Sequence, residues 1–365
     1  MKFKSKYISN SIVILLLIFN ITSCSFKSNT CQFILPEDIK ASAIPIKGEK
    51  LLAEYITTGS FNCVYTPDGF IGAMPINNNK IIHLADIETG EIIASACTKG
   101  RGPHELLVGN PHKDYYNGKL YLLDMATNRI KSVTVDDDSL KIENLFTYKG
   151  SAASFILAFN VINDTTYAFF TQRRQSAHVF IVNHKNKVLD SLDYRVIEDK
   201  RIKNEKLERV FISMNISPNR KDLFIVNRLF NSVKKYNIEN NKLSFDKEKF
   251  IVEPRYYVKN GLPKDKKHNL ILDSEIFASE KYLYLVTQPE YRSDYNKRVY
   301  DDKGRVLYVP DNTHIIVMDY DMNYIRTYKC DHYFKRIALT NKDGVFYAAD
   351  IENHCLQKYT LPYLE

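Results

Sequence analysis

The sequence contains no tryptophan and little glycine or proline, with 13 and 12 residues of these two types among 365. Collagen-like and low-complexity chains need far more of both, so these classes are excluded. Hydrophobic residues make up 44% of the chain, which supplies a core and excludes disorder of the whole chain. Lys and Arg exceed Asp and Glu only by 51 to 43, without a basic stripe. We therefore expect a folded protein with no nucleic-acid partner.

Long apolar runs are also missing, apart from one near the N-terminus. The residues from Ile12 to Phe19 form an unbroken apolar stretch, and Lys2, Lys4 and Lys6 precede it. This stretch of eight residues is too short for a bilayer core, which needs about 20. A basic start followed by a short apolar stretch is typical of a secretory signal peptide.

The sequence Ile-Thr-Ser-Cys at 21–24 resembles the lipobox of bacterial lipoproteins, in which an aliphatic residue and two small ones precede a cysteine. The resemblance implies that residues 1–23 are a signal peptide and that Cys24 becomes the lipidated N-terminus. Several acyl chains on one cysteine suffice for stable anchoring. We therefore expect a lipid-anchored protein of the cell envelope, in the outer membrane, with 24–49 as a tether. The alternative is an unmodified Cys24 behind an ordinary signal peptide.

The remaining cysteines indicate neither a disulfide framework nor a metal site. Their number is odd, and they show no CxxC pair and no Cys/His metal spacing. We expect buried single thiols, and no cofactor or metal, for the five residues Cys31, Cys63, Cys97, Cys330 and Cys355. The catalytic motifs GxSxG and HExxH do not occur, and the nine histidines are scattered.

From residue 50 onward the chain reads as short β-strands. Runs of Ile, Val, Phe, Tyr and Leu alternate with turn residues, which is the pattern of strands and hairpins. A strand–loop–strand unit recurs along this part of the chain, at 69–87, 119–136, 165–184, 222–239, 281–321 and 344–361. Units of about four strands at a spacing of roughly 45–65 residues predict an all-β fold, a six-bladed β-propeller over 50–365. The alternative is two unrelated β domains.

The sixth unit lacks one strand, because the chain ends soon after the predicted strand 354–361. Residues 50–57 precede the first unit and have no other partner. We predict that they complete the last blade and close the ring, which removes exposed sheet edges. Residues 25–45, by contrast, are expected to contribute little to the stability of the fold.

Three segments resemble known propeller sequences. The segments 124–130 and 350–356 resemble the D-x-x-N-H-x-I core of NHL-type propeller repeats. The segment 99–106, KGRGPHEL, resembles the K-G-R-G-P-x-E-[FL] signature of TolB-like six-bladed propeller lipoproteins from Bacteroidetes. This resemblance covers about residues 50–365 and implies the fold and the lipid anchor. It implies little about activity, because most members of this family have none assigned.

The glycine-rich part of this signature has two interpretations. Gly100 and Gly102 permit positive φ and Pro103 stiffens the exit, which suits a tight crossing between blades. In that structural interpretation Arg101 pairs with Glu105. The alternative is that the loop contacts a ligand. It is not a phosphate-binding loop, because no strand–glycine–helix context surrounds it.

The long loops fall on one face of the predicted propeller. With blade strands called a (inner) to d (outer), the d–a and b–c connections share a face. All four long connections belong to it, namely 98–107, 195–207, 253–269 and 289–313. Long loops are commonly functional, and these are rich in Arg, which binds anions, and in Tyr. The candidate ligand-binding residues are Arg101, His104, Glu105, Arg173, Arg174, Tyr291, Arg292 and Arg298.

Three functional hypotheses follow, one of which is a purely structural part of the cell envelope. The first is a non-enzymatic binding or scaffold protein for an anionic glycan, peptide or protein, of unspecified oligomeric state. The alternative is a propeller enzyme, such as a metal-dependent lactonase or a polysaccharide lyase. Its nearest candidate residues are Asp124, Asn128, Asn227 and Asp350, whose equivalence in the repeat favours a structural role in turns. A channel mouth with mainly Arg and Tyr favours binding, whereas clustered carboxylates and His favour an enzyme.

Overall fold

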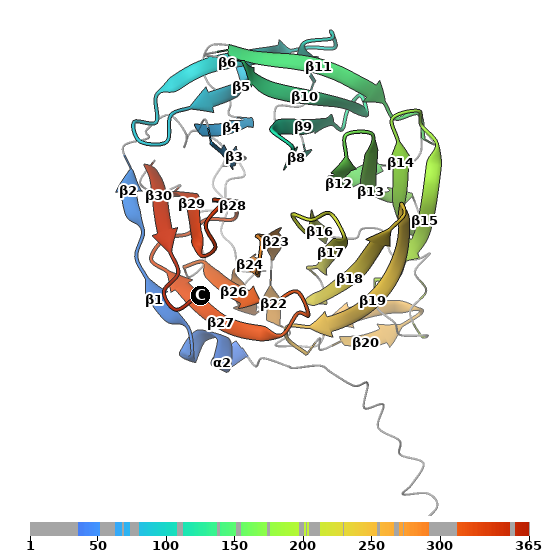
Figure 1. The fold of residues 1–365 in the computed structure, drawn as a ribbon. Helices are drawn as coiled ribbons and strands as arrows, with labels where there is room; N and C mark the ends of the chain where they lie inside the picture. The colour runs from blue at the N-terminus through green and yellow to red at the C-terminus, as the bar shows by residue number, and fades with distance from the viewer. Residues whose placement is uncertain are drawn as a thin grey trace, which may run out of the picture.

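The computed structural model shows six β-sheet blades arranged in a ring about a common axis (Figure 1). The residues that it describes are 36–51, 63–67, 69–73, 80–107, 112–136, 139–150, 155–173, 176–196, 201, 203, 212–228, 230–253, 256–265, 270–272, 274–291, 312–350 and 355–364. The predicted signal peptide, Cys24 and Cys31 lie outside these residues. The predicted fold class, an all-β six-bladed propeller, is confirmed.

Each blade has four antiparallel strands, and in blades 1 to 5 the first of these four along the chain lies innermost, whereas the outer strand of blade 6 comes from the N-terminal part of the chain (Figure 1). From the inner to the outer strand, the blades are: blade 1, β3 Cys63–Thr66, β4 Gly69–Ala73, β5 Lys80–Ala85 and β6 Ile92–Lys99; blade 2, β8 His112–Tyr116, β9 Lys119–Asp124, β10 Arg129–Asp136 and β11 Ser139–Thr147; blade 3, β12 Phe155–Asn163, β13 Thr166–Arg173, β14 Ser176–Asn183 and β15 Val188–Tyr194; blade 4, β16 Ile212–Ile216, β17 Asp222–Asn227, β18 Ser232–Glu239 and β19 Lys242–Phe250; blade 5, β23 Glu275–Ala278, β24 Leu283–Thr287, β26 His314–Met318 and β27 Tyr324–Cys330; and blade 6, β28 Ile337–Leu339, β29 Val345–Asp350, β30 Cys355–Thr360 and β2 Glu49–Leu51.

Asparagine and glycine build several of the tight turns within blades. Tyr116 pairs with Lys119, so Asn117 and Gly118 form a two-residue hairpin turn with φ of 49° and 72°. Positive φ at both positions is the backbone of a type I′ turn, which matches the twist of the flanking strands. The asparagines at 240–241 make the same kind of turn between β18 and β19, with φ of 51° and 60°.

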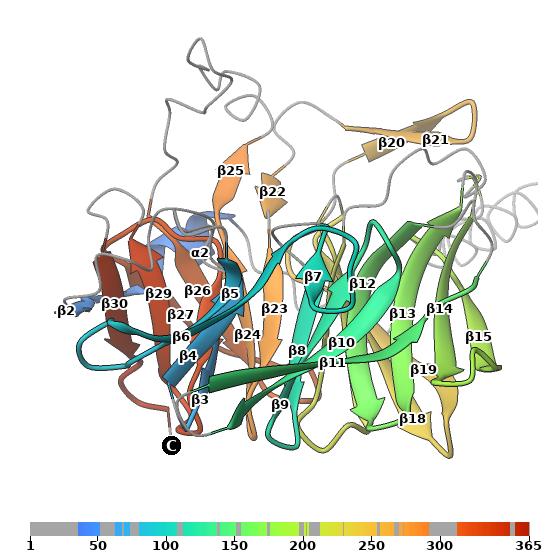
Figure 2. The same ribbon diagram turned by 90° about the horizontal axis from the view of Figure 1, so that it is seen from above.

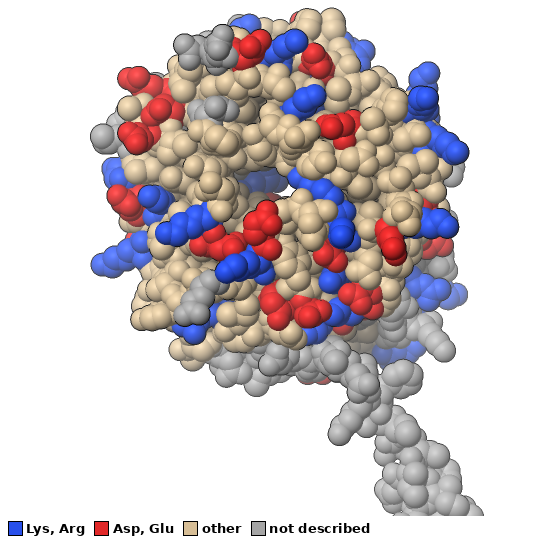
Figure 3. All heavy atoms as spheres, viewed as in Figure 1, with Lys and Arg blue, Asp and Glu red and all other residues tan. Residues whose placement is uncertain are grey.

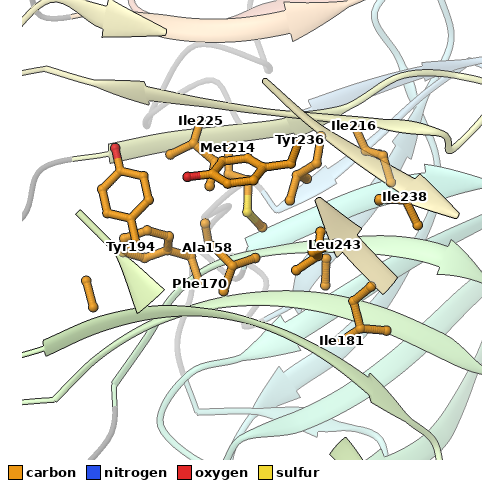
Figure 4. Packing of buried hydrophobic residues seen from close by; sticks show 14 of the residues in the cluster. Ala158, Phe170, Ile181, Tyr194, Met214, Ile216, Ile225, Tyr236, Ile238 and Leu243 are labelled. Carbon is orange, nitrogen blue, oxygen red and sulfur yellow. The ribbon is translucent and has the colours of Figure 1, made fainter. Parts of the chain in front are cut away.

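The core consists of apolar layers between neighbouring blades. Between blades 3 and 4, Phe170 and Ile181 face Ile225, Met214 and Tyr236 (Figure 4). All five side chains are buried. Because burial of each large apolar side chain contributes about 1.5–3 kcal/mol, these layers hold the blades in a ring.

An N-terminal strand closes the ring, as we predicted from the strand that the sixth unit lacks. β2 pairs antiparallel with β30, with Glu49 opposite Lys358 and Leu51 opposite Leu356. The strand begins at Glu49, one residue before the predicted start, and within the predicted 50–57 only residues 50 and 51 are described. Residues 52–62 lie outside the part of the chain that the structure describes.

The propeller also includes residues that were expected to be a tether. Helix α2, Pro36–Ala41, buries Ile39 completely, and β1, Ile44–Ile46, pairs parallel with the outer strand of blade 5, β27. We call residues 36–51 the N-terminal latch. The expected start of the propeller at residue 50 therefore moves to residue 36, and the expectation that 25–45 contributes little is corrected for 36–45. Three isolated isoleucines were too few to show a period in the sequence.

Four of the five predicted single thiols are described, and all four are buried: Cys63, Cys97, Cys330 and Cys355. Burial raises the pKa of the Cys97 thiol to about 11, so this thiol keeps its proton at neutral pH. Within the described ranges, no helix has the length and apolar character needed to cross a membrane.

The two faces of the ring differ. Figure 2 shows that long connections project from one face, including the pair β20 Tyr256–Lys259 and β21 Leu262–Asp265 and the pair β22 Leu270–Leu272 and β25 Pro289–Tyr291. We call this the long-loop face and the opposite one the short-turn face. Figures 1 and 3 view the short-turn face, on which the spheres of both charge signs surround a central opening (Figure 3).

Candidate functional site

The glycine-rich signature forms an extra edge strand on blade 1. After β6 the chain makes a tight loop, and the next strand, β7, Glu105–Leu106, pairs in parallel with the end of β6. Leu106 is completely buried and packs with Leu120 and Leu122 of blade 2. We call residues 100–107 the inter-blade loop, because they fill the outer gap between blades 1 and 2.

Strand β10 of blade 2 holds this loop by its main-chain carbonyls. Arg129 Nη1 donates to the Arg101 carbonyl at 2.5 Å, and Lys131 Nζ donates to the Pro103 carbonyl at 2.6 Å. The Lys131 side chain is fully buried, and its burial lowers its pKa. These contacts support the structural interpretation of the signature, since they fasten blade 1 to blade 2.

Two details of that interpretation were wrong. The Glu105 carboxylate pairs not with Arg101 but with the Gly102 N–H, which donates to it at 2.6 Å. Gly100 and Gly102 do not have positive φ. They lie close to the Glu105 side chain, since a Cβ on Gly102 would lie 2.9 Å from Glu105 Oε2 and one on Gly100 closer still, so a larger residue would displace this carboxylate.

Two clefts flank Pro103 at the outer rim. One has a volume of about 540 Å³ and its lining includes Lys80, Cys97, His104 and Glu105. The other, of about 310 Å³, is lined by Arg101 and residues of β10 and β11. The structure therefore brings Arg101, His104 and Glu105 together between the outer strands of two blades.

For Arg101, His104 and Glu105 a role in ligand binding stays a prediction, as it does for the other candidate residues. Arg173 ends β13 and Tyr291 ends β25, and both strands end toward the long-loop face (Figure 2). Their side chains are not described, and Arg174, Arg292 and Arg298 lie outside the described residues. Their predicted role in ligand binding stays a prediction.

A charged cluster that the sequence did not reveal lies at the mouth of the channel on the long-loop face. Arg228 directly follows β17 of blade 4, Glu275 begins β23 of blade 5, and Arg336 directly precedes β28 of blade 6. These positions belong to b–c and d–a connections, which lie on the long-loop face. We call these three residues the mouth cluster.

Both arginines contact the same carboxylate. Arg228 Nη2 lies 3.0 Å from Glu275 Oε1, and Arg336 Nε lies 3.3 Å from Oε1 and 3.2 Å from Oε2. The side chains are 25%, 17% and 34% exposed in chain order, so the cluster is accessible to solvent. The cluster thus combines two guanidinium groups with one carboxylate. Each guanidinium has five N–H donors in a planar fork, which suits the binding of an anion.

Buried polar contacts fix the segments that carry the arginines. The Phe230 N–H donates to Asn227 Oδ1 at 3.2 Å, which shapes the turn around Arg228. Ahead of β28, the Phe334 N–H donates to Thr313 Oγ1 at 2.8 Å, and the same hydroxyl donates to the Phe334 carbonyl at 2.7 Å. The geometry of the mouth is therefore set by the blades themselves.

The sequence did not reveal the mouth cluster, because its three residues are far apart along the chain. Glu275 lies 47 residues from Arg228 and 61 residues from Arg336, so nothing local connects them. The position of each residue relative to the predicted strands is the signal that identifies such a cluster. In a propeller, residues directly after a b strand and directly before an a strand lie at this mouth.

At the short-turn face, a different arginine ties blades together. Arg220 of blade 4 pairs with Asp114 of blade 2 at 2.6 Å and donates to the Val161 carbonyl of blade 3 at 3.0 Å. The side chains of Arg220 and Asp114 are each only 12% exposed. This pair therefore has a structural role across the channel.

The residues considered for catalysis serve in turns where their side chains are described. Asp124 accepts the N–H groups of Leu107 and Ala126, and Asn227 accepts that of Phe230. Asn128 has a turn conformation with φ of 51°. In the part of the chain with described placement, no three His, Cys, Asp or Glu side chains are grouped as metal ligands would be.

No protein-family model matches the chain, and no curated protein matches its sequence. Solved structures with a similar fold include a DUF4221 family member from Bacteroides vulgatus, with 12% identity and a TM-score of 0.46, covering 87% of this chain and 95% of that one. A putative 6-phosphogluconolactonase from Bacteroides fragilis has 9% identity and a TM-score of 0.43, covering 82% and 79%. The calcium-binding protein regucalcin from Agrobacterium tumefaciens has 10% identity and a TM-score of 0.46, covering 87% and 95%.

Proposed function

We propose that this protein is a lipid-anchored lipoprotein of the cell envelope, of the TolB-like propeller family, that binds an anionic ligand at its channel mouth without transforming it. The observation that carries the binding proposal is the mouth cluster of Arg228, Glu275 and Arg336. The candidate ligands are an anionic glycan, peptide or protein.

The mouth cluster favours binding because of its composition and its support. Its two arginines come from blades 4 and 6 and converge on a glutamate of blade 5. Binding sites that are already ordered lose less entropy when a ligand arrives. A lactonase or lyase would need carboxylates or histidines to act as bases or metal ligands, whereas arginine recognises anions and keeps its proton.

The anchor is proposed from the sequence. The lipobox at 21–24 and the KGRGPHEL segment at 99–106 both resemble the lipoprotein family. The latch begins at Pro36, so the residues between Cys24 and the propeller span at most about 40 Å when fully extended. The propeller would therefore stay close to the membrane surface.

The test of the binding proposal is a ligand panel measured by calorimetry on the mature chain in detergent. We expect acidic oligosaccharides or acidic peptides to bind and their neutral counterparts to show no binding. Affinity should fall as salt is raised, because exposed charges are screened over about 8 Å at physiological ionic strength. Binding that is indifferent to ligand charge and to salt would contradict the proposal.

A further inference from the structure

We infer that Glu275 occupies the place of the ligand's own carboxylate, so the group recognised at the mouth is a carboxylate that displaces Glu275. This inference rests on the proposed function, and it specifies the chemistry of the same site. It assigns Glu275 the role of an internal competitor that sets which anions bind.

The gap between the two guanidinium groups already fits a carboxylate. Both Glu275 oxygens take part, with Arg228 on one side at 3.0 Å and Arg336 on the other at 3.2 and 3.3 Å. These distances are those of ion pairs, and they are slightly longer than the ~2.7–2.9 Å typical of the strongest charge-assisted hydrogen bonds. A carboxylate from a ligand would meet the same donors at the same spacing.

Glu275 can leave this gap without disturbing the sheet. Its own backbone begins β23, and the next residue is fixed, since the Ile276 N–H donates to Ser213 Oγ of blade 4 at 3.1 Å. A rotation about the side-chain bonds of Glu275 therefore suffices to move its carboxylate toward solvent. The carboxylate of the ligand would take over the contacts that Glu275 gives up, so the two arginines keep a carboxylate partner throughout the exchange.

The Glu275 carboxylate also explains how the site would discriminate between small anions and larger ligands that carry a carboxylate. With Glu275 in place, a small anion with a single weak contact does not replace a side chain held at high local concentration. A carboxylate carried on a larger ligand gains further contacts around the mouth. Such a ligand, for example a uronate-containing glycan, can displace Glu275.

The experiment measures oligogalacturonate binding to the mature chain in detergent. Glu275→Gln keeps the size of the side chain and removes its charge, so we expect binding to tighten by about 5- to 30-fold, the amount set by loss of two partly exposed ion pairs. Glu253→Gln is the matched control, since it removes an exposed charge from the long-loop face outside the cluster. It should change the affinity by less than about twofold.

Two further ligands test the chemistry. The methyl ester of the same oligosaccharide should bind neither the wild type nor Glu275→Gln, because it has no carboxylate. A sulfated oligosaccharide of equal length should bind more weakly than oligogalacturonate. Equal or tighter binding of the sulfated ligand would overturn the assignment of a carboxylate.

The outcomes separate this inference from the proposed function. If Arg228→Ala and Arg336→Ala each weaken binding but Glu275→Gln weakens it too, Glu275 positions the arginines and the inference is overturned while the proposed function stands. If the arginine variants bind oligogalacturonate and every other acidic ligand as the wild type does, the proposed function fails as well.

Discussion

The Gly48 N–H donates to the Asp331 carboxylate, with distances of 3.2 and 3.4 Å to its two oxygens, across 283 residues of sequence. Gly48 lies between β1, which pairs with blade 5, and β2, which pairs with blade 6. A Cβ at this position would lie 2.8 Å from the Tyr359 ring, so the absence of a side chain at Gly48 allows the backbone to run close to blade 6. The first described segment of the chain therefore joins the last two blades.

Truncation of the buried latch residues should destabilise the whole propeller. Ile39 is 0% exposed and Ile46 is 7% exposed. We expect Ile39→Ala and Ile46→Ala each to lower the free energy of unfolding by about 2–4 kcal/mol, the usual cost of such a cavity. Ile93→Ala, at a side chain that is 40% exposed, is the control and should stay within about 0.5 kcal/mol. Denaturant unfolding measures all three, and equal small effects would show that the latch is not part of the cooperative fold.

The buried lysine of blade 2 should be essential for the inter-blade loop. Lys131→Ala removes the donor to the Pro103 carbonyl and the packing of a fully buried side chain. We expect a loss of about 2–4 kcal/mol in the free energy of unfolding, from an unsatisfied carbonyl together with a cavity. The control is Lys141→Ala, whose side chain is 61% exposed and which should change little. A variant as stable as the wild type would contradict the role given to this contact.

Alkaline pH should unfold the protein through its buried tyrosines. Burial raises the pKa of Tyr167 and of Tyr284 to about 12 from 10, and it raises that of Tyr121 as well. Between these values the unfolded chain loses protons that the folded chain keeps. The stabilisation is thus fully present below pH 10 and is lost as pH rises toward 12. The denaturant midpoint should fall over this window while tyrosinate absorbance rises in the same transition, and independent titration of tyrosines in a folded protein would contradict this.

The blade strands were predictable because their signals are local. Alternating apolar residues bounded by turns such as Asn117-Gly118 set most strand ends, and the spacing of the units set the number of blades. The register also confirms the repeat, since Asp124 lies opposite Arg129 and Asn227 lies opposite Ser232 at matching strand ends. Local turn chemistry and alternation thus determine most of this fold.

The buried cations were not predictable in the same way. Lys131 and Lys234 occupy matching positions on β10 and β18. Each donates to a main-chain carbonyl in the loop after the last strand of the preceding blade, that of Pro103 for Lys131 and that of Arg195 for Lys234. A lysine in a strand usually indicates a solvent-facing position. Only the assembled ring places these carbonyls within reach, just as it assembles the mouth cluster from three blades.

Lipidation is predicted from residues outside the described structure. Cys24→Ala removes the residue that would carry the acyl chains, so we expect the protein to leave the membrane fraction or to retain its signal peptide. Mass spectrometry of the wild type should find acyl chains on Cys24, because anchoring by several chains is stable. An unacylated wild type, together with unchanged fractionation of the variant, would show that the lipobox is not used.

The central claim is that anionic ligands bind at the mouth cluster and not at the outer rim. The most direct measurement compares the affinity of the Arg228→Ala/Arg336→Ala double variant with that of Arg101→Ala, whose exposed side chain lies by the rim clefts. Loss of two charge-assisted contacts should weaken binding of an acidic ligand at least about tenfold in the double variant, with a shallower salt dependence, while Arg101→Ala binds as the wild type does. Unchanged binding in the double variant, with loss in Arg101→Ala, would contradict the account and move the site to the inter-blade loop.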